Sequence, residues 1–412
     1  ALDGTHAAIA RDPELSALHF GSERDGEAWR KLSAFHRSIE PRLLEALMDP
    51  FPAWSPALKL GVGNLLRIAS MFAKSGRRLS EGLFQSAAAR RVLPSLALHV
   101  DVGPDDWFGS GLGYMLGLTA STGGYAVPRG GAQTITNALV TLLERQGGRL
   151  RLGARATRIV VRGQRAVGVQ LEGGEEIRAS RAVLADTSAP SLFLSLLEGQ
   201  SLPGGALRKM RKFPLGFGTF KLDYALSAPV PWNVPEARLS AVVHAGESLD
   251  DLSRFVREVR SGALPDRPYL VMGQQSLLDR TRAPQTGQTL YVYSRVPSDL
   301  PGGWDAARER FADTITSRIE GLAPGFGSLV LARKAHAPPD LERMNANLIG
   351  GDLGGGSNAW NRQLLFRPVF PYFRYRMPIE RLYLCSSYAH PGAGVHGMCG
   401  CNAARIALRD IE

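Results

Sequence analysis

Residues that could bind a reactive group gather near the end of the chain, in the glycine-rich stretch 389–408. An apolar run at 382–385 precedes it and predicts a strand, and the run 403–408 predicts a helix. Glycine lets a backbone approach a ligand closely, and a helix N-terminus offers unpaired N–H groups. A strand, a glycine-rich loop and a helix start in this order typically hold an anionic or polar ligand. The rest of such a site must lie elsewhere in the chain.

Two histidines flank this loop, and each has two interpretations. One is a proton-handling group at the edge of a ligand, because imidazole titrates near neutral pH. The other is a loop histidine that makes local hydrogen bonds. We predict local bonds for His390. For His396 both interpretations stay open, with ligand contact made mainly through its backbone N–H.

Other reactive residue types give weaker patterns. Cys399 and Cys401 could form a redox or metal pair, but no second pair stands at ligand spacing, and we interpret both as small apolar packing residues. Lys221 and Asp223 alternate with apolar residues on one predicted strand, and we expect them to face solvent rather than a substrate. No Ser/His/Asp order or metal-ligand spacing stands out, so the sequence names no catalytic residue.

The elements that must position these residues begin with helices. Apolar residues at helical spacing predict helices up to Pro52, from 55 to Gly76, and over 81–100. From 122 onward the pattern is a loop, a helix and a strand starting at 150–152. The apolar face of that helix carries Leu139, Leu142 and Leu143.

Strand patterns follow. A three-stranded antiparallel meander is predicted, with turns at 163–164 and 173–174, and then a return strand that ends at Asp186. The three strands are Arg158–Arg162, Ala166–Leu171 and Glu176–Ser180. Four more strands and two helices are predicted between 205 and 335, where an ordinary sheet core is favoured over the wall of an apolar cavity. The run GGDLGGG at 350–356 is interpreted as a flexible loop.

Composition sets the broad class. A chain of 412 residues with 44% hydrophobic and 21% charged residues predicts two globular domains, or one with a large insertion. The net charge is +11, and the densest basic cluster, at 208–212, is interpreted as a solvated helix face, with contact to anionic lipid as the second interpretation. No nucleic-acid motif is present. Three cysteines indicate a reducing compartment and hence the cytoplasm.

Three stretches together resemble one known family. They are GGYAVPRGGAQTITNALVTLLERQGG, ARATRIVVRGQRAVGVQL and LYLCSSYAHPGAGVHGMCGCNAA. In this order and spacing they are similar to the phytoene desaturase-like FAD-dependent oxidoreductases, which include carotenoid isomerases. The stretch GTFKLDYALSAPVPW looks most like the pyridine nucleotide-disulphide oxidoreductase domain-containing protein 2 branch. The resemblance covers nearly the whole chain.

The resemblance implies a mixed α/β (α+β) fold in which a Rossmann-like FAD-binding domain is split by a substrate-binding domain of sheet plus helices. The implied segments are a helical lid or substrate region at 1–121, the middle of the FAD-binding domain at 122–204, the substrate-binding domain at 205–338, and the C-terminal part of the FAD-binding domain at 339–412.

The same resemblance implies FAD as cofactor and assigns residues to it. The C-terminal loop would lie against the flavin with Gly392, Gly394, Val395, His396 and Met398. A helix N-terminus there would meet the negative charge of a reduced flavin.

Further assignments come from the strands. Ala156 would contact adenine through its backbone, and Ala185 and Asp186 would end a strand that passes close to the cofactor. Ser386 and Ser387 stand where the family usually has Gly-Ala, so a side chain there would either crowd the phosphates or hydrogen-bond them.

One family feature is not found. The family begins with a strand, a G-x-G-x-x-G turn, a helix and an acidic residue, which together seat the pyrophosphate. The nearest match, 109–113, has the wrong spacing and is interpreted as a structural loop. The first residues, ALDGTHAAIARDP, match an internal stretch of the family, so we expect that an N-terminal segment on the order of a hundred residues is missing.

Three hypotheses about function follow. The first is an FAD-dependent oxidoreductase that desaturates or isomerises a long apolar, polyene-like substrate, with a flavin amine oxidase as the related alternative. The second is a non-enzymatic interaction protein on a flavoprotein fold that has lost FAD. The third is compatible with both: peripheral association with a membrane surface, because apolar substrates reside in membranes. No apolar run reaches the length of a bilayer span.

Overall fold

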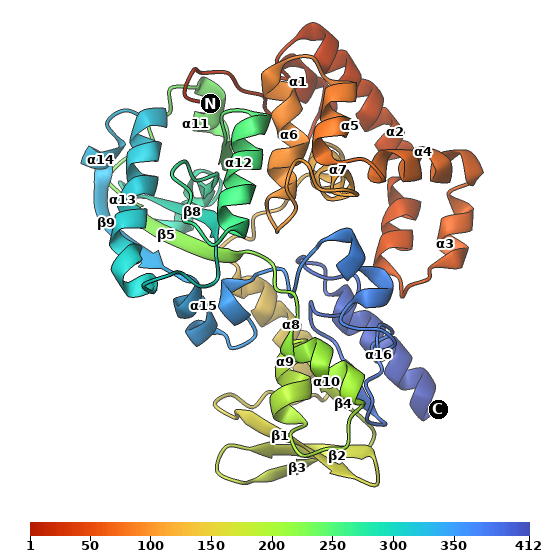
Figure 1. Cartoon of the computed structure of the whole chain (residues 1–412). Coiled ribbons are helices and arrows are strands. Elements are labelled where there is room, and N and C mark those ends of the chain that lie inside the picture. Colours follow the sequence, from red (N-terminus) through yellow and green to blue (C-terminus); the bar gives the residue numbers. More distant parts are fainter. The chain divides into compact units, whose positions relative to one another are not determined.

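The computed structural model describes residues 1–412, and the chain divides into two units (Figure 1). Unit 1 comprises Ala1–Ile39, Leu66–Leu150 and Phe217–Leu341. Unit 2 comprises Glu40–Leu65, Arg151–Gly216 and Glu342–Glu412. Neither unit is continuous in sequence, because the chain passes from one to the other five times. Our four-segment domain division stays a prediction.

Unit 1 is built around a five-stranded antiparallel sheet with the strand order β6-β7-β8-β5-β9. The strands are β5 (Gly218–Leu226), β6 (Val242–Ala245), β7 (Leu270–Gly273), β8 (Gln288–Val296) and β9 (Val330–His336). The first four confirm the predicted strands. β9 was not predicted, because its residues at this sheet edge are mostly half-exposed or exposed and do not alternate.

Helix α13 (Trp304–Leu322) covers one face of this sheet (Figure 1). Alternate residues of β5 point toward it: the ring of Phe220 stacks on Trp304 with centroids 5.6 Å apart and meets Phe311 edge-on at 5.0 Å. Burial of these rings is what fixes the strand register. This face is therefore the ordinary sheet core that the sequence favoured.

The remaining helices confirm most of the predicted ones. In unit 1 they are α1 (Pro13–Leu18), α5 (Gly76–Leu83), α6 (Ala87–Ala97), α7 (Ser110–Thr122), α8 (Gln133–Arg145), α11 (Pro235–Leu239), α12 (Leu249–Arg260) and α14 (Phe326–Leu329). Helices α2 (Glu23–Met48), α4 (Val62–Phe72) and α15 (Pro338–Met344) run from one unit into the other. None of the helices combines the length and apolar character that a membrane-spanning segment requires.

Two local predictions about the helical part were wrong. The single helix expected from 55 to 76 is divided into α3 (Trp54–Lys59) and α4, because Gly61 between them takes a left-handed φ of +79°. The glycines at 109–113 do not form a loop but begin α7. A Cβ added to Gly113 would lie 2.1 Å from the carbonyl oxygen of Leu93 on α6. Glycine is needed there because two helix backbones touch.

Helix α8 confirms the predicted helix but not the burial of its apolar side. It has no buried residue, and Leu139 and Leu142 of the predicted apolar face are 63% and 56% exposed. The strand expected at 150–152 is absent, and those residues are irregular.

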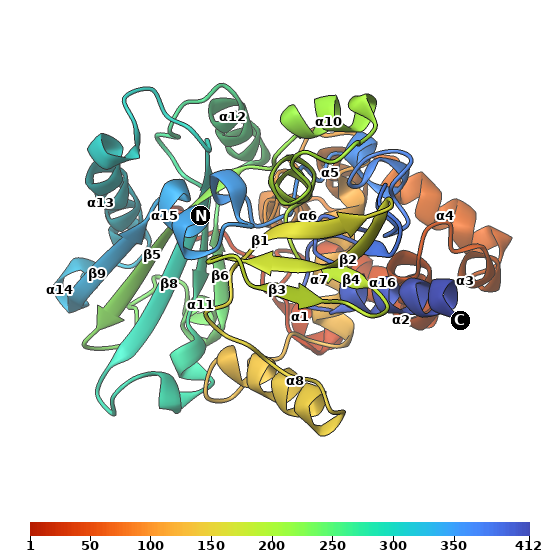
Figure 2. The same cartoon turned by 90° about the horizontal axis from the view of Figure 1, so that it is seen from below.

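Unit 2 contains two small sheets. The predicted meander is confirmed as β1 (Ala156–Arg162), β2 (Arg165–Leu171) and β3 (Glu176–Arg178), which lie side by side in Figure 2. The predicted return strand is β4 (Val183–Ala185), and it pairs in parallel with β10 (Leu382–Leu384). The other elements are α9 (Ala189–Ser191), the π-helical turn η1 (Leu192–Leu196), α10 (Gly204–Arg211), α16 (Met398–Ile411) and the short 3-10 turns η4 (Ile349–Gly351), η5 (Trp360–Arg362) and η6 (Leu364–Phe366).

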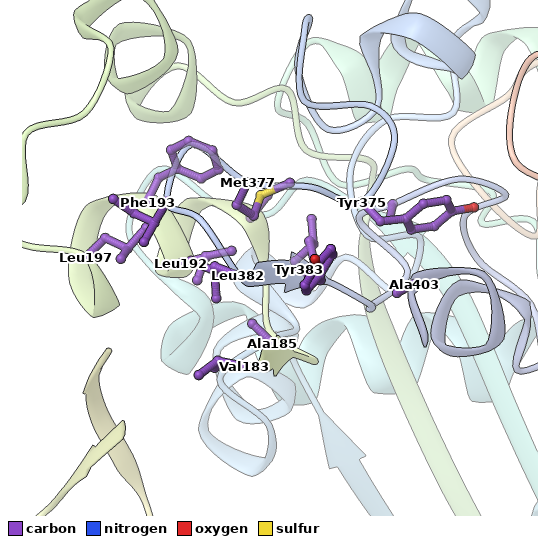
Figure 3. Close-up of a cluster of buried hydrophobic side chains, with 14 of the residues drawn as sticks. Val183, Ala185, Leu192, Phe193, Leu197, Tyr375, Met377, Leu382, Tyr383 and Ala403 are labelled. Atoms are coloured by element: carbon purple, nitrogen blue, oxygen red, sulfur yellow. The ribbon is translucent and has the colours of Figure 1, made fainter. Parts of the chain in front are cut away.

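The core of unit 2 surrounds the β4–β10 pair. Figure 3 shows the buried side chains that gather there from three parts of the sequence. Among them are Val183 and Ala185 of β4, Leu382 and Tyr383 of β10, and Ala403 of α16. This packing fixes where both strands end, and with them the loops that follow.

The GGDLGGG run is largely a loop, as predicted, and a buried carboxylate holds it; its flexibility stays a prediction. Asp352 is 3% exposed and accepts hydrogen bonds from the backbone N–H groups of Gly216, Gly354 and Gly356 at 2.6 to 2.8 Å. Gly355 and Gly356 adopt φ values of +67° and +100°. Glycine allows the left-handed turns that aim these N–H groups inward.

A pair of neutral histidines in unit 1 predicts a pH dependence of stability. His99 and His244 share a hydrogen bond of 2.8 Å between their Nε2 atoms, and burial lowers their pKa values to about 2 and about 4. Because both values lie below the unfolded value of 6.5, only the unfolded chain gains protons as the pH falls. Their stabilisation is full above about pH 6.5 and is lost progressively toward about pH 4.

We expect each histidine to reduce the free energy of unfolding by roughly 1–2 kcal/mol between pH 7 and pH 5. Urea unfolding across this range measures the slope. The H99Q/H244Q variant should show a shallower slope even if it is less stable at every pH. An unchanged slope in the variant would assign the acid sensitivity to other groups.

Candidate functional site

The parallel pairing of β4 and β10 brings two predicted site segments together. Ala185 lies opposite Leu384, and the N–H of Cys385 donates to the carbonyl of Ala185 at 3.0 Å. Both strands end here, so Asp186 and Ser386 follow at the same edge of the sheet. Carboxyl ends of parallel strands are where ligands bind in α/β folds.

The side chains of Ser386 and Ser387 both contact other residues of the protein. The hydroxyl of buried Ser386 donates to the carbonyl of Thr187 at 2.6 Å and accepts from the N–H of Tyr388. A Cβ added to Gly355 would lie 2.5 Å from the hydroxyl of Ser387, so that side chain packs tightly on the glycine loop. Ser386 thus ties the two strand ends together.

The glycine-rich loop is shaped by close contacts at two of its predicted residues. Gly392 is buried with a φ of +101°, and a Cβ there would meet the guanidinium of Arg367 at 3.1 Å. Gly394 has a φ of +147°, and a Cβ there would lie 2.6 Å from the imidazole of His396. Any other residue at either position would displace one of these two side chains. The neighbouring Val395 is 94% exposed.

His396 offers a hydrogen-bond donor that the protein does not use. Its Nδ1 accepts the backbone N–H of Met398 at 3.0 Å, which places the ring proton on Nε2. That Nε2 is buried and makes no hydrogen bond of good geometry, although the carbonyl of Gly392 lies close to the ring. Burial lowers the pKa of His396 more than this carbonyl raises it, which keeps the ring neutral. A buried N–H without an acceptor is costly, so this donor suits a bound acceptor.

The start of α16 adds more donors. Its first intrahelical bond runs from the N–H of Cys401 to the carbonyl of Gly397 at 3.1 Å. The amides of Cys399 and Gly400 precede that bond, at the end of the helix that carries partial positive charge. Cys399 is buried as predicted, with its sulfur near two backbone carbonyls. Cys401 is exposed, so its interpretation as a packing residue was wrong.

Other predicted residues lie apart from this loop. Ala156 is exposed at the start of β1, in the separate meander sheet. His390 is buried, its Nε2 lies 3.0 Å from the carbonyl oxygen of Asp49, and burial lowers its pKa to about 4. This is the predicted local role. Lys221 and Asp223 of β5 are both partly exposed and form an ion pair with each other.

Two residues that hold the site together were not singled out in the sequence. Arg367 is 2% exposed and donates to the carbonyls of Gly354 at 2.6 Å, Gly355 at 3.0 Å and Ser387 at 2.9 Å. Asp352 holds the same glycine run through its N–H groups. The sequence contained one signal: Arg367 is a lone charge inside the otherwise apolar run LLFRPVF.

Comparison with known proteins shows what the chain is similar to. A model described as flavin containing amine oxidoreductase matches residues 64–220. The chain is 29% identical to pyridine nucleotide-disulfide oxidoreductase domain-containing protein 2 of Rattus norvegicus over 95% of this chain and 74% of the relative. It is 26% identical to a zeta-carotene-forming phytoene desaturase of Myxococcus xanthus over 76% of this chain and 57% of the relative.

The chain is thus similar to flavin amine oxidoreductases and phytoene desaturases, at 29% identity or below. Solved structures agree at the level of fold. Putrescine oxidase bound to putrescine has a TM-score of 0.52 and 13% identity over 93% of this chain and 75% of its own. An oxidoreductase from Methanosarcina mazei has a TM-score of 0.53 and 12% identity over 85% of this chain and 74% of its own.

Members of the flavin amine oxidoreductase and phytoene desaturase-like family typically bind FAD, and the residues around β10 and α16 fit such a group. The unused Nε2–H of His396 and the first amides of α16 are donors. A flavin presents carbonyl oxygens and, when reduced, negative charge, which donors of this kind stabilise. Gly392 and Gly394 have positive φ values and no side chain of their own, which lets the loop close around Arg367 and His396.

Proposed function

We propose that this protein is an FAD-dependent oxidoreductase that desaturates or isomerises a long apolar, polyene-like substrate. One observation supports it above the others. The loop between β10 and α16 keeps a buried imidazole donor without a partner, next to a helix N-terminus. Buried donors without a good acceptor are uncommon in folded proteins, and a bound flavin would supply an acceptor for this one.

In this proposal the residues of the glycine-rich loop bind and orient the cofactor. His396 donates from Nε2, the start of α16 stabilises negative charge, and the backbone at Gly392 and Gly394 contacts the ring system. Asp186 and Ser386 at the strand ends, and Ala156 in the meander, are the further candidate contacts. When bound, FAD supplies the hydride acceptor, so the protein needs no nucleophile or metal of its own for that step.

Two observations support an apolar substrate: the names of the relatives, and two aromatic side chains on one face of the five-stranded sheet. Several relatives are named phytoene desaturases, which act on carotenoids. On the face of the sheet turned away from α13, Tyr291 and Tyr293 stack with an interplanar angle of 5° and are only partly buried. Parallel aromatic rings suit contact with a flat conjugated chain. The description of the family model makes an amine the second candidate substrate.

The test has two steps. The protein is incubated with FAD, separated from free flavin by gel filtration and scanned for absorbance. A retained and shifted flavin band supports the proposal, and a protein peak without flavin contradicts it for this chain. The flavin-bound protein is then offered polyenes and primary amines separately, with flavin bleaching as the readout. Bleaching by amines alone would replace the desaturase proposal with the amine oxidase one.

A variant of His396 tests the cofactor contact directly. The H396A protein should bind FAD about ten-fold more weakly, because one hydrogen bond to the cofactor is worth on the order of 1.4 kcal/mol. The loss of flavin fluorescence on titration measures the dissociation constant. V395A is the matched control, since that side chain is exposed and adjacent. Equal affinities for both variants and the wild type would remove His396 from the site.

A further inference from the structure

Unit 2 contains a cavity of about 300 Å³ that none of the candidate flavin-binding residues lines. It lies between α10 with the segment that follows it and the chain from 356 to 370. Small-molecule sites commonly have volumes of roughly 300–1,000 Å³, so this cavity has room for a headgroup and the first atoms of a chain.

The charge around this cavity has one sign. Its lining includes Arg208, Lys209, Lys212, Arg362 and Arg367, and it includes no aspartate or glutamate. The first four are exposed, and none of them forms an ion pair. Arg367 adds a buried positive charge whose position is fixed by its bonds to the glycine loop. Like charges that line one cavity repel one another, and a bound anion would offset this repulsion.

The rest of the wall is apolar. Met210 and Val369 are buried within it, and Phe213 contributes a half-buried ring. Phe366 and Phe370 line the same cavity and are 50% and 53% exposed. Exposed aromatic rings beside unpaired cations form a surface that is both apolar and basic. An ordinary solvated helix face lacks the apolar part. Arg211 of the same basic cluster does not line the cavity.

We propose that this cavity binds an amphiphilic anion, meaning a carboxylate or phosphate headgroup attached to an apolar chain. The guanidinium and ammonium groups bind the headgroup by charge-assisted hydrogen bonds, and the aromatic and aliphatic wall covers the first part of the chain. Two sources supply this chemistry: an amphiphile dissolved as a monomer, or an anionic lipid presented by a membrane surface. The four exposed cations of this cavity are not among the candidate flavin-binding residues, so they can be changed without altering that set, whereas Arg367 contacts it through Gly392 and Ser387.

The experiment compares two double variants of the full chain. R208Q/K212Q removes two charges from the cavity wall. R178Q/R211Q removes two charges from exposed positions of the same unit outside the wall. All four side chains are exposed, so both variants should fold, and their thermal unfolding midpoints check this.

Binding is measured in two assays. Calorimetric titration with oleate, oleyl alcohol and acetate separates the contribution of the charged headgroup from that of the apolar chain. Co-sedimentation with phosphatidylcholine vesicles, with and without phosphatidylserine, tests the membrane source.

We expect oleate to bind the wild type at least about ten-fold more tightly than either oleyl alcohol or acetate. R208Q/K212Q should lose at least about ten-fold in oleate affinity or in binding to anionic vesicles, and R178Q/R211Q should lose neither. Loss in the oleate arm supports the dissolved source, and loss in the vesicle arm supports the membrane source. The proposal is overturned if both variants weaken equally, if charged and uncharged amphiphiles bind alike, or if neither oleate nor vesicles bind.

Discussion

Replacing Arg367 by methionine is expected to lower the free energy of unfolding by about 3 kcal/mol or more. The guanidinium is 2% exposed and donates to four backbone carbonyls, of Gly354, Gly355, Ser357 and Ser387. Methionine has a similar length but no donor, so these buried carbonyls would lose their partner. Each unsatisfied buried group costs on the order of 1–3 kcal/mol. The same change should weaken FAD binding, because Gly392 of the cofactor loop packs on this guanidinium.

Urea unfolding followed by circular dichroism measures the stability loss, and flavin titration measures the binding loss. R362M is the matched control, because Arg362 lies in the same segment but is exposed. We expect it to change the free energy of unfolding by less than about 0.5 kcal/mol. If R367M were as stable as R362M, the carbonyls would have other partners, and the role of Arg367 as a scaffold would be wrong.

Replacing Gly113 by alanine is the second large change, and it acts in unit 1. The added methyl carbon would lie 2.1 Å from the carbonyl oxygen of Leu93, and the nearest atoms are backbone, which cannot rotate away. Helices α6 and α7 would have to separate. Overpacking of this kind costs typically 1–3 kcal/mol and sometimes more, so we expect roughly 3 kcal/mol.

Gly82 provides the control for this prediction. It also lies inside a helix, α5, but a Cβ added there meets no atom within 4 Å. G82A should therefore stabilise the protein by roughly 0.5–1 kcal/mol through helix propensity alone. Opposite signs for the two glycine-to-alanine changes, measured by urea unfolding, are the expected result. A stabilised G113A would mean that the two helices do not touch at this point.

Regular elements were predictable because their patterns are local. The alternation in β5 and β8 reflects one buried face, and the glycine turns of the meander fixed the boundaries of β1 and β2. Helix α8 was predictable as an element, whereas the exposure of Leu139 was not, since periodicity marks an apolar side and does not say what covers it.

The irregular part of the candidate site was harder to predict. The strand, loop and helix at the C-terminus were recognised from glycine spacing. These elements are held by hydrogen bonds between side chains and backbone, which follow no repeating pattern in the sequence. Asp352 bonds to Gly216, far away in sequence, and Arg367 bonds to Ser387. The glycines at 109–113 were misread because glycine serves both loops and close helix contacts, and only the position of Leu93 distinguishes them.

The division of both units among separate stretches affects how the protein is made. Unit 1 needs its last strand and helix, up to Leu341, and unit 2 needs the C-terminal helix that ends near Glu412. At ribosomal rates of roughly 5–20 residues per second, the nascent chain spends on the order of tens of seconds before either core can close. During this time the amphipathic helices near the N-terminus have no sheet to pack against. Synthesis of this protein should therefore depend on chaperones that bind emerging chains, and removing the C-terminal helix α16 should leave the core of unit 2 open.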